Sequence, residues 1–127
     1  MSRNDRWWKL KKHELKIAKA YIQAYNEYKE AVIEYENTSN GYDETLKTET
    51  IMRKTEDDIS DYLENVAVIR DIEESFTRWT SIDYQEVLWD YEINGNKTVD
   101  EFTKTVIDTE FRKWCYGFAK IHGIKTT

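Results

Sequence analysis

The two histidines are the side chains that first suggest catalysis or metal binding, because imidazole serves both as a general base and as a zinc ligand. His13-Glu14 begins like the helical His-Glu-x-x-His motif of zinc proteases, but Ile17 occupies the position of the second histidine. His122 has no second ligand at helical spacing. We therefore interpret both histidines as surface or partly buried side chains without a chemical role.

The other residues that could carry chemistry are four acids and one cysteine. The acids could hold a hard cation, but they lack the glycine-punctuated spacing of a calcium loop, which favours a solvated helix face; they are Asp57, Asp58, Asp61 and Glu64. Cys115 lies among large apolar residues at helical spacing, and we interpret it as a small core residue. The chain has no glycine-rich phosphate loop. We predict no catalytic residue, no metal site and no cofactor, and a protein that is not an enzyme.

The composition favours an all-α protein of about one domain. The chain has 127 residues, of which 39% are apolar and 14% aromatic, enough to bury a core and too many for a disordered chain. It has no proline and only four glycines, too few turn residues for a loop-rich enzyme or an all-β sandwich. A single cysteine excludes an internal disulfide, and the longest apolar run is residues 66–69. We therefore predict a cytoplasmic protein with no membrane contact.

Residues 5–36 are predicted to form one long N-terminal helix. A stripe of large side chains recurs at alternating steps of four and three residues, as on one face of a helix; it consists of Tyr21, Tyr25, Tyr28, Val32 and Tyr35. We expect this tyrosine stripe to pack on later helices of the same chain, and a homodimer is the alternative. Turn-forming residues at 37–41 end the helix. We accordingly divide the chain into residues 1–55, a long helix and a loop, and residues 56–127, a helical domain.

Two helices are predicted between residues 56 and 92. The first covers residues 56–79, and its apolar residues recur every three or four positions, which predicts a buried face; they include Ile59, Leu63, Val66, Ile69, Ile72 and Phe76. The second is short and covers residues 83–92, with Val87, Leu88 and Tyr91 directed inward.

A helix-turn-helix is predicted over residues 98–123. A Thr-Val-Asp-Glu capping box at residues 98–101 begins its first helix, which covers residues 98–106. A break at residues 107–109 precedes the second helix, residues 110–122, whose apolar face consists of Phe111, Trp114, Cys115, Phe118 and Ile121. The expected fold class is all-α, with a long N-terminal helix and a C-terminal helical bundle that contains the helix-turn-helix.

The charge distribution favours nucleic acid as the partner of the last helix. The net charge is −6, and residues 37–84 hold five basic residues against twelve acids, whereas residues 111–127 hold four basic residues and no acid. If the apolar side of the last helix faces the core, the residues that face outward are Glu110, Arg112, Lys113, Tyr116 and Lys120. Cations on that side can neutralise phosphates and reach base edges. The structural alternative is a solvated basic stripe on a terminal helix. We predict that double-stranded DNA is bound by Arg112, Lys113, Tyr116 and Lys120.

The sequence from residue 69 onward resembles the C-terminal half of the ArpU/RinA-type phage late-transcription regulators. The matching pieces are the apolar residues of IRDIEESF and EVLWDY, the predicted scaffold helix at 98–106 and the basic helix at 108–123. The resemblance implies a helix-turn-helix like region four of sigma factors, in a regulator of phage late packaging and lysis genes that works with the host RNA polymerase in the bacterial cytoplasm. Arg112, Lys113 and Tyr116 would then touch DNA and Lys120 a flanking phosphate. Further backbone contacts would come from the basic start, Arg3, Arg6, Lys9, Lys11 and Lys12.

A second function stays open because the last helix is richer in aromatic residues than the recognition helices of that family. The acidic net charge also opposes nonspecific DNA affinity. The alternative is an acidic phage-encoded inhibitor or adaptor that binds a host or defence protein, with residues 37–84 imitating the phosphate charge of nucleic acid. A well-solvated helix face also explains that segment. A structural coiled-coil protein, based on the tyrosine stripe alone, is the third possibility.

Overall fold

The computed structural model describes residues 8–40 and 56–125, and every regular element in those two ranges is helical. This confirms the predicted all-α class. The predicted loop at residues 42–55, and with it the predicted division of the chain after residue 55, lies outside the described residues. The helices are α1 (Lys12–Gln23), α2 (Tyr25–Asn40), α4 (Glu56–Trp79), a 3-10 turn η2 (Ile82–Tyr84), α5 (Gln85–Glu92) and α6 (Glu101–Ile121).

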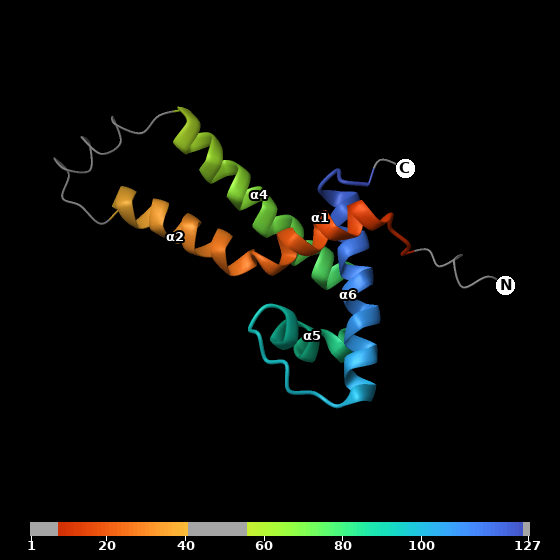
Figure 1. Ribbon diagram of the computed structural model, residues 1–127. Helices are drawn as coiled ribbons and strands as arrows, with labels where there is room; N and C mark the ends of the chain where they lie inside the picture. The colour runs from red at the N-terminus through yellow and green to blue at the C-terminus, as the bar shows by residue number, and fades with distance from the viewer. Residues whose placement is uncertain (1–7, 41–55, 126–127) are drawn as a thin grey trace.

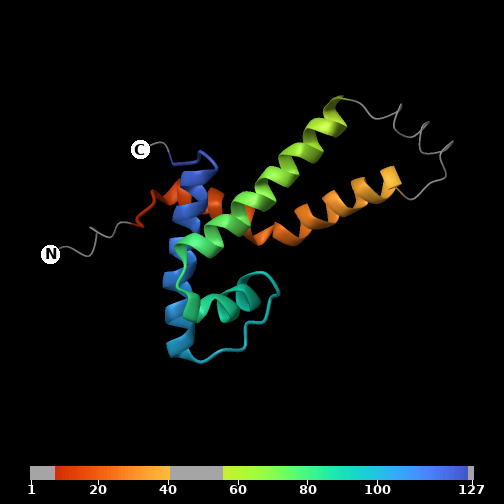
Figure 2. The same cartoon turned by 180° about the vertical axis from the view of Figure 1, so that it is seen from behind.

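The helices form a body and an arm (Figures 1 and 2). α2 and α4 run side by side in opposite directions and project from the rest of the molecule as the arm. The body consists of α1, α5, α6 and the C-terminal part of α4. Within it, α1 crosses the C-terminal half of α6, and α5 lies beside the N-terminal half (Figure 1).

The prediction of one long N-terminal helix over residues 5–36 is wrong, because the chain bends at Ala24. There the backbone has φ −92° and ψ 9°, and the Ala24 N–H is shared between the carbonyls of Ala20 and Tyr21, each at 3.2 Å. The bend lets α1 pack on α6 while α2 packs on α4. A straight helix could not reach both partners, so tertiary packing overrides the continuous heptad-like spacing.

The predicted break at residues 107–109 is also absent, and α6 is one continuous helix. Ile107 is fully buried and extends the apolar face of the helix by one turn, and the Lys104 ammonium binds the Asp108 carboxylate at 2.8 Å across one turn. The helix also begins later than predicted. Its N-cap is Asp100, whose carboxylate accepts the Thr103 N–H at 2.6 Å, in place of a capping box from residue 98. The described residues therefore contain no helix-turn-helix at 98–123.

The core forms where α1, α4 and α5 converge on α6. Trp114 and Phe118 of α6 lie at its centre, and the Trp114 indole N–H donates to the Ile72 carbonyl at 3.0 Å. The apolar face predicted for the last helix is confirmed at Phe111, Trp114, Cys115 and Phe118, all of which are buried. Fully buried partners from the other helices surround them: Ala18, Ile22, Val68, Ile72 and Leu88.

The tyrosine stripe packs within the chain, as predicted. Tyr21 contacts the ring of Phe118, with centroids 5.4 Å apart. Tyr25 meets Trp89 edge to face at 4.9 Å, and its hydroxyl donates to the Glu73 carboxylate. Further out along the arm, Tyr35 and Tyr62 stack with centroids 4.3 Å apart.

The buried face predicted for residues 56–79 is correct only at the base of the arm. Ile69 and Ile72 are buried, whereas Ile59, Leu63 and Val66 are 44%, 59% and 36% exposed. The apolar spacing continues along the whole helix, but only its C-terminal part has α6 to pack against. The sequence pattern indicates a continuous apolar side, and the fold leaves part of that side uncovered.

Cys115 is expected to be unreactive in the folded protein. Its side chain is fully buried, and burial raises the pKa of the thiol far above its usual range, so almost no reactive thiolate forms. Labelling with a thiol-reactive dye should be slow in native buffer and fast in denaturant. Rapid labelling of the native protein would show that the α6 face is open to solvent.

Candidate nucleic-acid interface

Three lysines line the exposed side of α1. Lys12, Lys16 and Lys19 recur at steps of four and three residues, and all three are exposed. The opposite side of the helix is buried. Glu14, the single acid of α1, lies on that buried side, where its carboxylate accepts the Lys11 N–H at 2.8 Å. The outer side of α1 therefore presents positive charge with no neighbouring acid on the same helix.

Arg112 is an exposed cation of α6, the helix on which α1 packs. Burial raises the pKa of the Cys115 thiol, and the positive charges of Lys19 and Arg112 both act to lower it, so each cation lies near that thiol in the region where α1 packs on α6. The Arg112 side chain is exposed and has no ion-pair partner among the described residues. We call Lys12, Lys16, Lys19 and Arg112 the basic face.

Lys113 is held by a buried carboxylate. Its ammonium lies 2.8 Å from a carboxylate oxygen of Glu110, and its side chain is only 23% exposed. The other Glu110 oxygen accepts the Ser81 N–H at 2.5 Å and so joins α6 to the chain that leaves α4. The prediction that Glu110 faces outward is wrong, because the residue is 3% exposed. Lys113 compensates an interior charge, and it would have to leave Glu110 to reach a phosphate.

Replacing Glu110 by glutamine is expected to destabilise the protein by about 1–2 kcal/mol at neutral pH, because two charge-assisted hydrogen bonds are lost. Burial alone would raise the pKa of Glu110, but Lys113 and the Ser81 N–H outweigh it and lower this pKa in the folded state. The stabilisation is therefore present above the unfolded-state pKa, about 4.3, and lost as pH falls through the lower folded-state pKa.

Urea denaturation of the wild type and of Glu110→Gln across an acidic pH series measures this effect. The difference in unfolding free energy should shrink as pH falls, and the exposed Glu30→Gln should behave like the wild type. A difference that does not change with pH would contradict the role of the ionised carboxylate.

Tyr116 does not face outward as predicted, whereas Lys120 beside it is exposed. Tyr116 is 9% exposed and packs edge to face on Trp79, with centroids 5.5 Å apart, so it does not face outward as expected. The Lys120 ammonium lies 5.4 Å from the Tyr116 ring centroid and 5.8 Å from that of Trp79. Lys125 covers Tyr116 from 5.7 Å. These lysines form cation–π contacts at the junction of α4 and α6.

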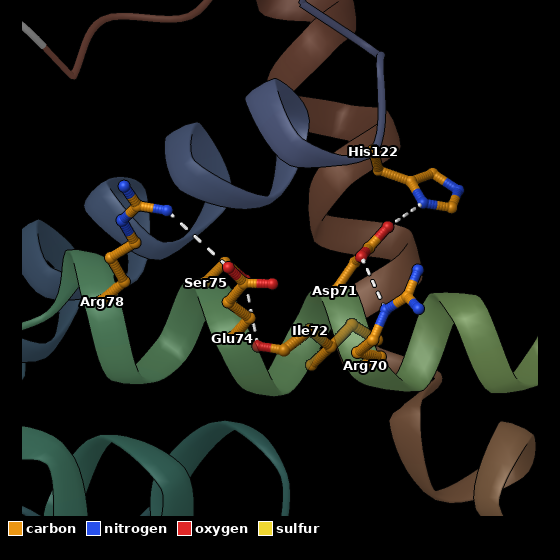
Figure 3. Close-up of polar contacts among 7 residues, drawn as sticks. All are labelled: Arg70, Asp71, Ile72, Glu74, Ser75, Arg78 and His122. Carbon is orange, nitrogen blue, oxygen red and sulfur yellow. Dashed lines mark hydrogen bonds and ion pairs between the residues drawn. The ribbon is translucent and has the colours of Figure 1, made fainter.

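A histidine–aspartate pair fixes the end of α6 against α4 (Figure 3). The Nδ1 atom of His122 lies 2.9 Å from an Asp71 carboxylate oxygen, and the imidazole stacks on Phe118 with centroids 5.0 Å apart. Arg70 approaches the other Asp71 oxygen at 3.8 Å. The pair secures the part of α6 on which α1 packs, and so positions the basic face.

The structure thus separates the four residues predicted to bind DNA. Arg112 and Lys120 are exposed, Lys113 is ion-paired and Tyr116 is buried. Their contact with DNA stays a prediction. Lys9 and Lys11 of the basic start are exposed, and Arg3 and Arg6 lie outside the described residues.

Sequence reasoning missed Lys16 and Lys19 as members of a binding surface. Their spacing with Lys12 is visible in the sequence. This spacing indicates a common exposed side because α1 is a separate helix whose opposite side is buried.

Comparisons with known proteins add no family. No protein family model matches the chain, and no curated protein or solved structure shows significant similarity to it. Across residues 8–40 and 56–125, no cluster of three or more His, Cys, Asp or Glu side chains could hold a metal ion. None of the helices in that part of the chain is both long and apolar enough to cross a bilayer.

Proposed function

We propose that this protein binds double-stranded DNA, and that the basic face provides the phosphate contacts. The observation that carries the proposal is the row of three exposed lysines on α1, with no acid on the outer side of that helix, together with the exposed Arg112 on the helix that α1 packs against. Lysine and arginine neutralise phosphates and release condensed counterions, which is the main source of protein–DNA affinity. Arg112 has the planar donor group that can also reach a guanine edge.

The separation of charge in the molecule supports this orientation. Two stretches of the arm, residues 25–36 and 58–69, carry seven acids and one lysine, and all seven acids are exposed. DNA would be repelled by the arm and attracted to α1. The acidic net charge therefore directs the approach of the duplex, although it weakens binding elsewhere on the surface.

The biological role that we propose is regulation of phage late genes together with the host RNA polymerase. This role rests on the resemblance of residues 69–123 to the ArpU/RinA-type regulators. Because α6 is continuous, the mode of DNA contact differs from a helix-turn-helix. In this proposal α6 supports α1 and supplies Arg112, and Lys120 lies further along α6 as a flanking contact.

Fluorescence polarisation with a labelled late-promoter duplex and a scrambled duplex across a sodium chloride series tests the proposal. Four phosphate contacts predict that log K falls with log salt concentration with a slope of about −4. A regulator should also bind the promoter duplex more tightly than the scrambled one. Absence of binding to both duplexes at low salt would contradict DNA binding, and equal affinity for the two would contradict sequence-specific regulation.

A further inference from the structure

The arm carries an uncovered apolar surface. Ile59, Leu63 and Val66 of α4 are 44%, 59% and 36% exposed, and Ile33 of α2 is 51% exposed. We call these four residues the arm stripe. Isolated exposed apolar residues are common, but four large ones on two adjacent helices of one arm are more than this, and exposed apolar patches mark interaction sites.

Helix geometry places the arm stripe on one side of the arm. On α4, Ile59, Leu63 and Val66 lie about a quarter turn beyond the side that faces α2, which Tyr62 marks through its contact with Tyr35. On α2, Ile33 lies about a third of a turn beyond the centre of the tyrosine stripe, in the same rotational sense. Because the two helices run in opposite directions (Figure 2), this rotation brings both sets to the same side. The stripe therefore borders the groove between α2 and α4.

Acidic side chains are dense on the two helices that carry the arm stripe. Glu27, Glu30, Glu34 and Glu36 are exposed on α2, and Asp58, Asp61 and Glu64 are exposed on α4, against the single basic residue Lys29 between positions 25–36 and 58–69. Seven acids and one lysine leave a net charge of −6 on these two ranges. An apolar surface on a negatively charged arm favours a ligand that has apolar side chains on one side and positively charged side chains next to them.

We propose that the arm stripe binds an amphipathic helix of a partner protein that carries leucine-like residues on one side and lysine or arginine beside them. Ile59, Leu63 and Val66 follow the four- and three-residue spacing of a helix in a coiled coil. A third helix can therefore insert its apolar side chains along the groove between α2 and α4. A second copy of the arm is a poor occupant, because it would bring two surfaces of charge −6 together. Four side chains make a small interface, so we expect a transient complex.

Isothermal titration with a synthetic leucine–lysine peptide tests the proposal. Its leucines are spaced to share one side of a helix, and a scrambled peptide of the same composition and charge cannot form that side. The wild type should bind the amphipathic peptide at least about tenfold more tightly than the scrambled one. Leu63→Asn should reduce the affinity by about tenfold without changing the charge. It should keep its helical circular dichroism, because Leu63 is mostly exposed.

Phe102→Asn is the matched control, since Phe102 is 76% exposed and belongs to the first turn of α6, outside the two helices of the arm. It should bind the peptide as the wild type does. Equal binding of the two peptides, or an unchanged affinity of Leu63→Asn, would reduce the effect to unspecific ionic attraction and overturn the proposal. A wild-type dimer in sedimentation that Leu63→Asn dissociates would assign the stripe to a second copy and also overturn it. None of these outcomes depends on DNA binding.

Discussion

Replacing Gly117 by alanine is expected to destabilise the protein by about 2 kcal/mol, although alanine is the better helix former. A Cβ atom at position 117 would overlap Cδ1 and Cγ of the Trp79 indole, which packs directly on the α6 backbone. Overpacking of this kind costs about 1–3 kcal/mol or more, against about 1 kcal/mol gained in helix propensity. Thermal unfolding followed by circular dichroism should show a clearly lower midpoint than that of the wild type.

A double-mutant cycle with Trp79→Leu separates the overlap from other effects. Leucine is smaller and can move away from the new methyl group, so Gly117→Ala should be neutral or stabilising in that background. If alanine stabilises the wild-type protein as well, then the indole does not pack on position 117 as described.

Replacing Lys12, Lys16 and Lys19 together by glutamine is expected to have the largest effect on DNA binding. The variant should lose affinity on the order of a hundredfold at low salt, and the salt slope should become shallower by about three units, because each phosphate contact contributes about 0.9. All three side chains are exposed, and glutamine is a good helix former, so α1 should remain folded. Polarisation across the salt series measures both quantities.

The matched control removes three lysines elsewhere. Lys29, Lys97 and Lys104 lie outside the basic face, and Lys97 and Lys104 are already paired with Glu92 and Asp108. Their triple glutamine variant has the same net charge as the α1 variant. It should keep most of the salt slope. Equal losses in the two variants would show that DNA responds to overall charge and not to the basic face.

Local sequence patterns predicted a helix well where that helix packs one side on a single neighbouring surface. The 56–79 helix, the short helix before residue 92 and the apolar face of the last helix follow from three- and four-residue spacing. Cys115 was expected to be buried for the same reason, and it is. The periodicity reports contact with one side of the core in the short helix, in the last helix and in the C-terminal part of the 56–79 helix, whereas Ile59, Leu63 and Val66 keep the spacing and stay exposed.

The errors arose where packing between distant segments decides the structure. The bend at Ala24 comes from two different partners, α6 for α1 and α4 for α2, and no proline or glycine marks it. The continuity of α6 depends on Ile107 joining the core, although the residues around it are moderate helix formers. The inward position of Glu110 requires Ser81 and Lys113 as partners, and Ser81 is 29 positions away in the chain.

The site was predicted in part for the same reason. A charge count identified the basic residues of the last helix, of which Arg112 remains on the basic face. It could not show that Lys113 pairs with a buried acid, or that α1 packs on the helix that carries Arg112. Which cations gather on one surface depends on how two helices cross, and that crossing has no local sequence pattern.

A two-dimensional NMR titration of the ¹⁵N-labelled protein with a short DNA duplex tests the central claim most directly. The basic face predicts that amide shifts concentrate in α1, around Lys12 to Lys19, and near Arg112 of α6. The exposed side of α2 should stay unchanged. Shifts that map to the arm instead, or that leave α1 unaffected while DNA binds, would contradict the assignment of the basic face as the DNA-binding surface.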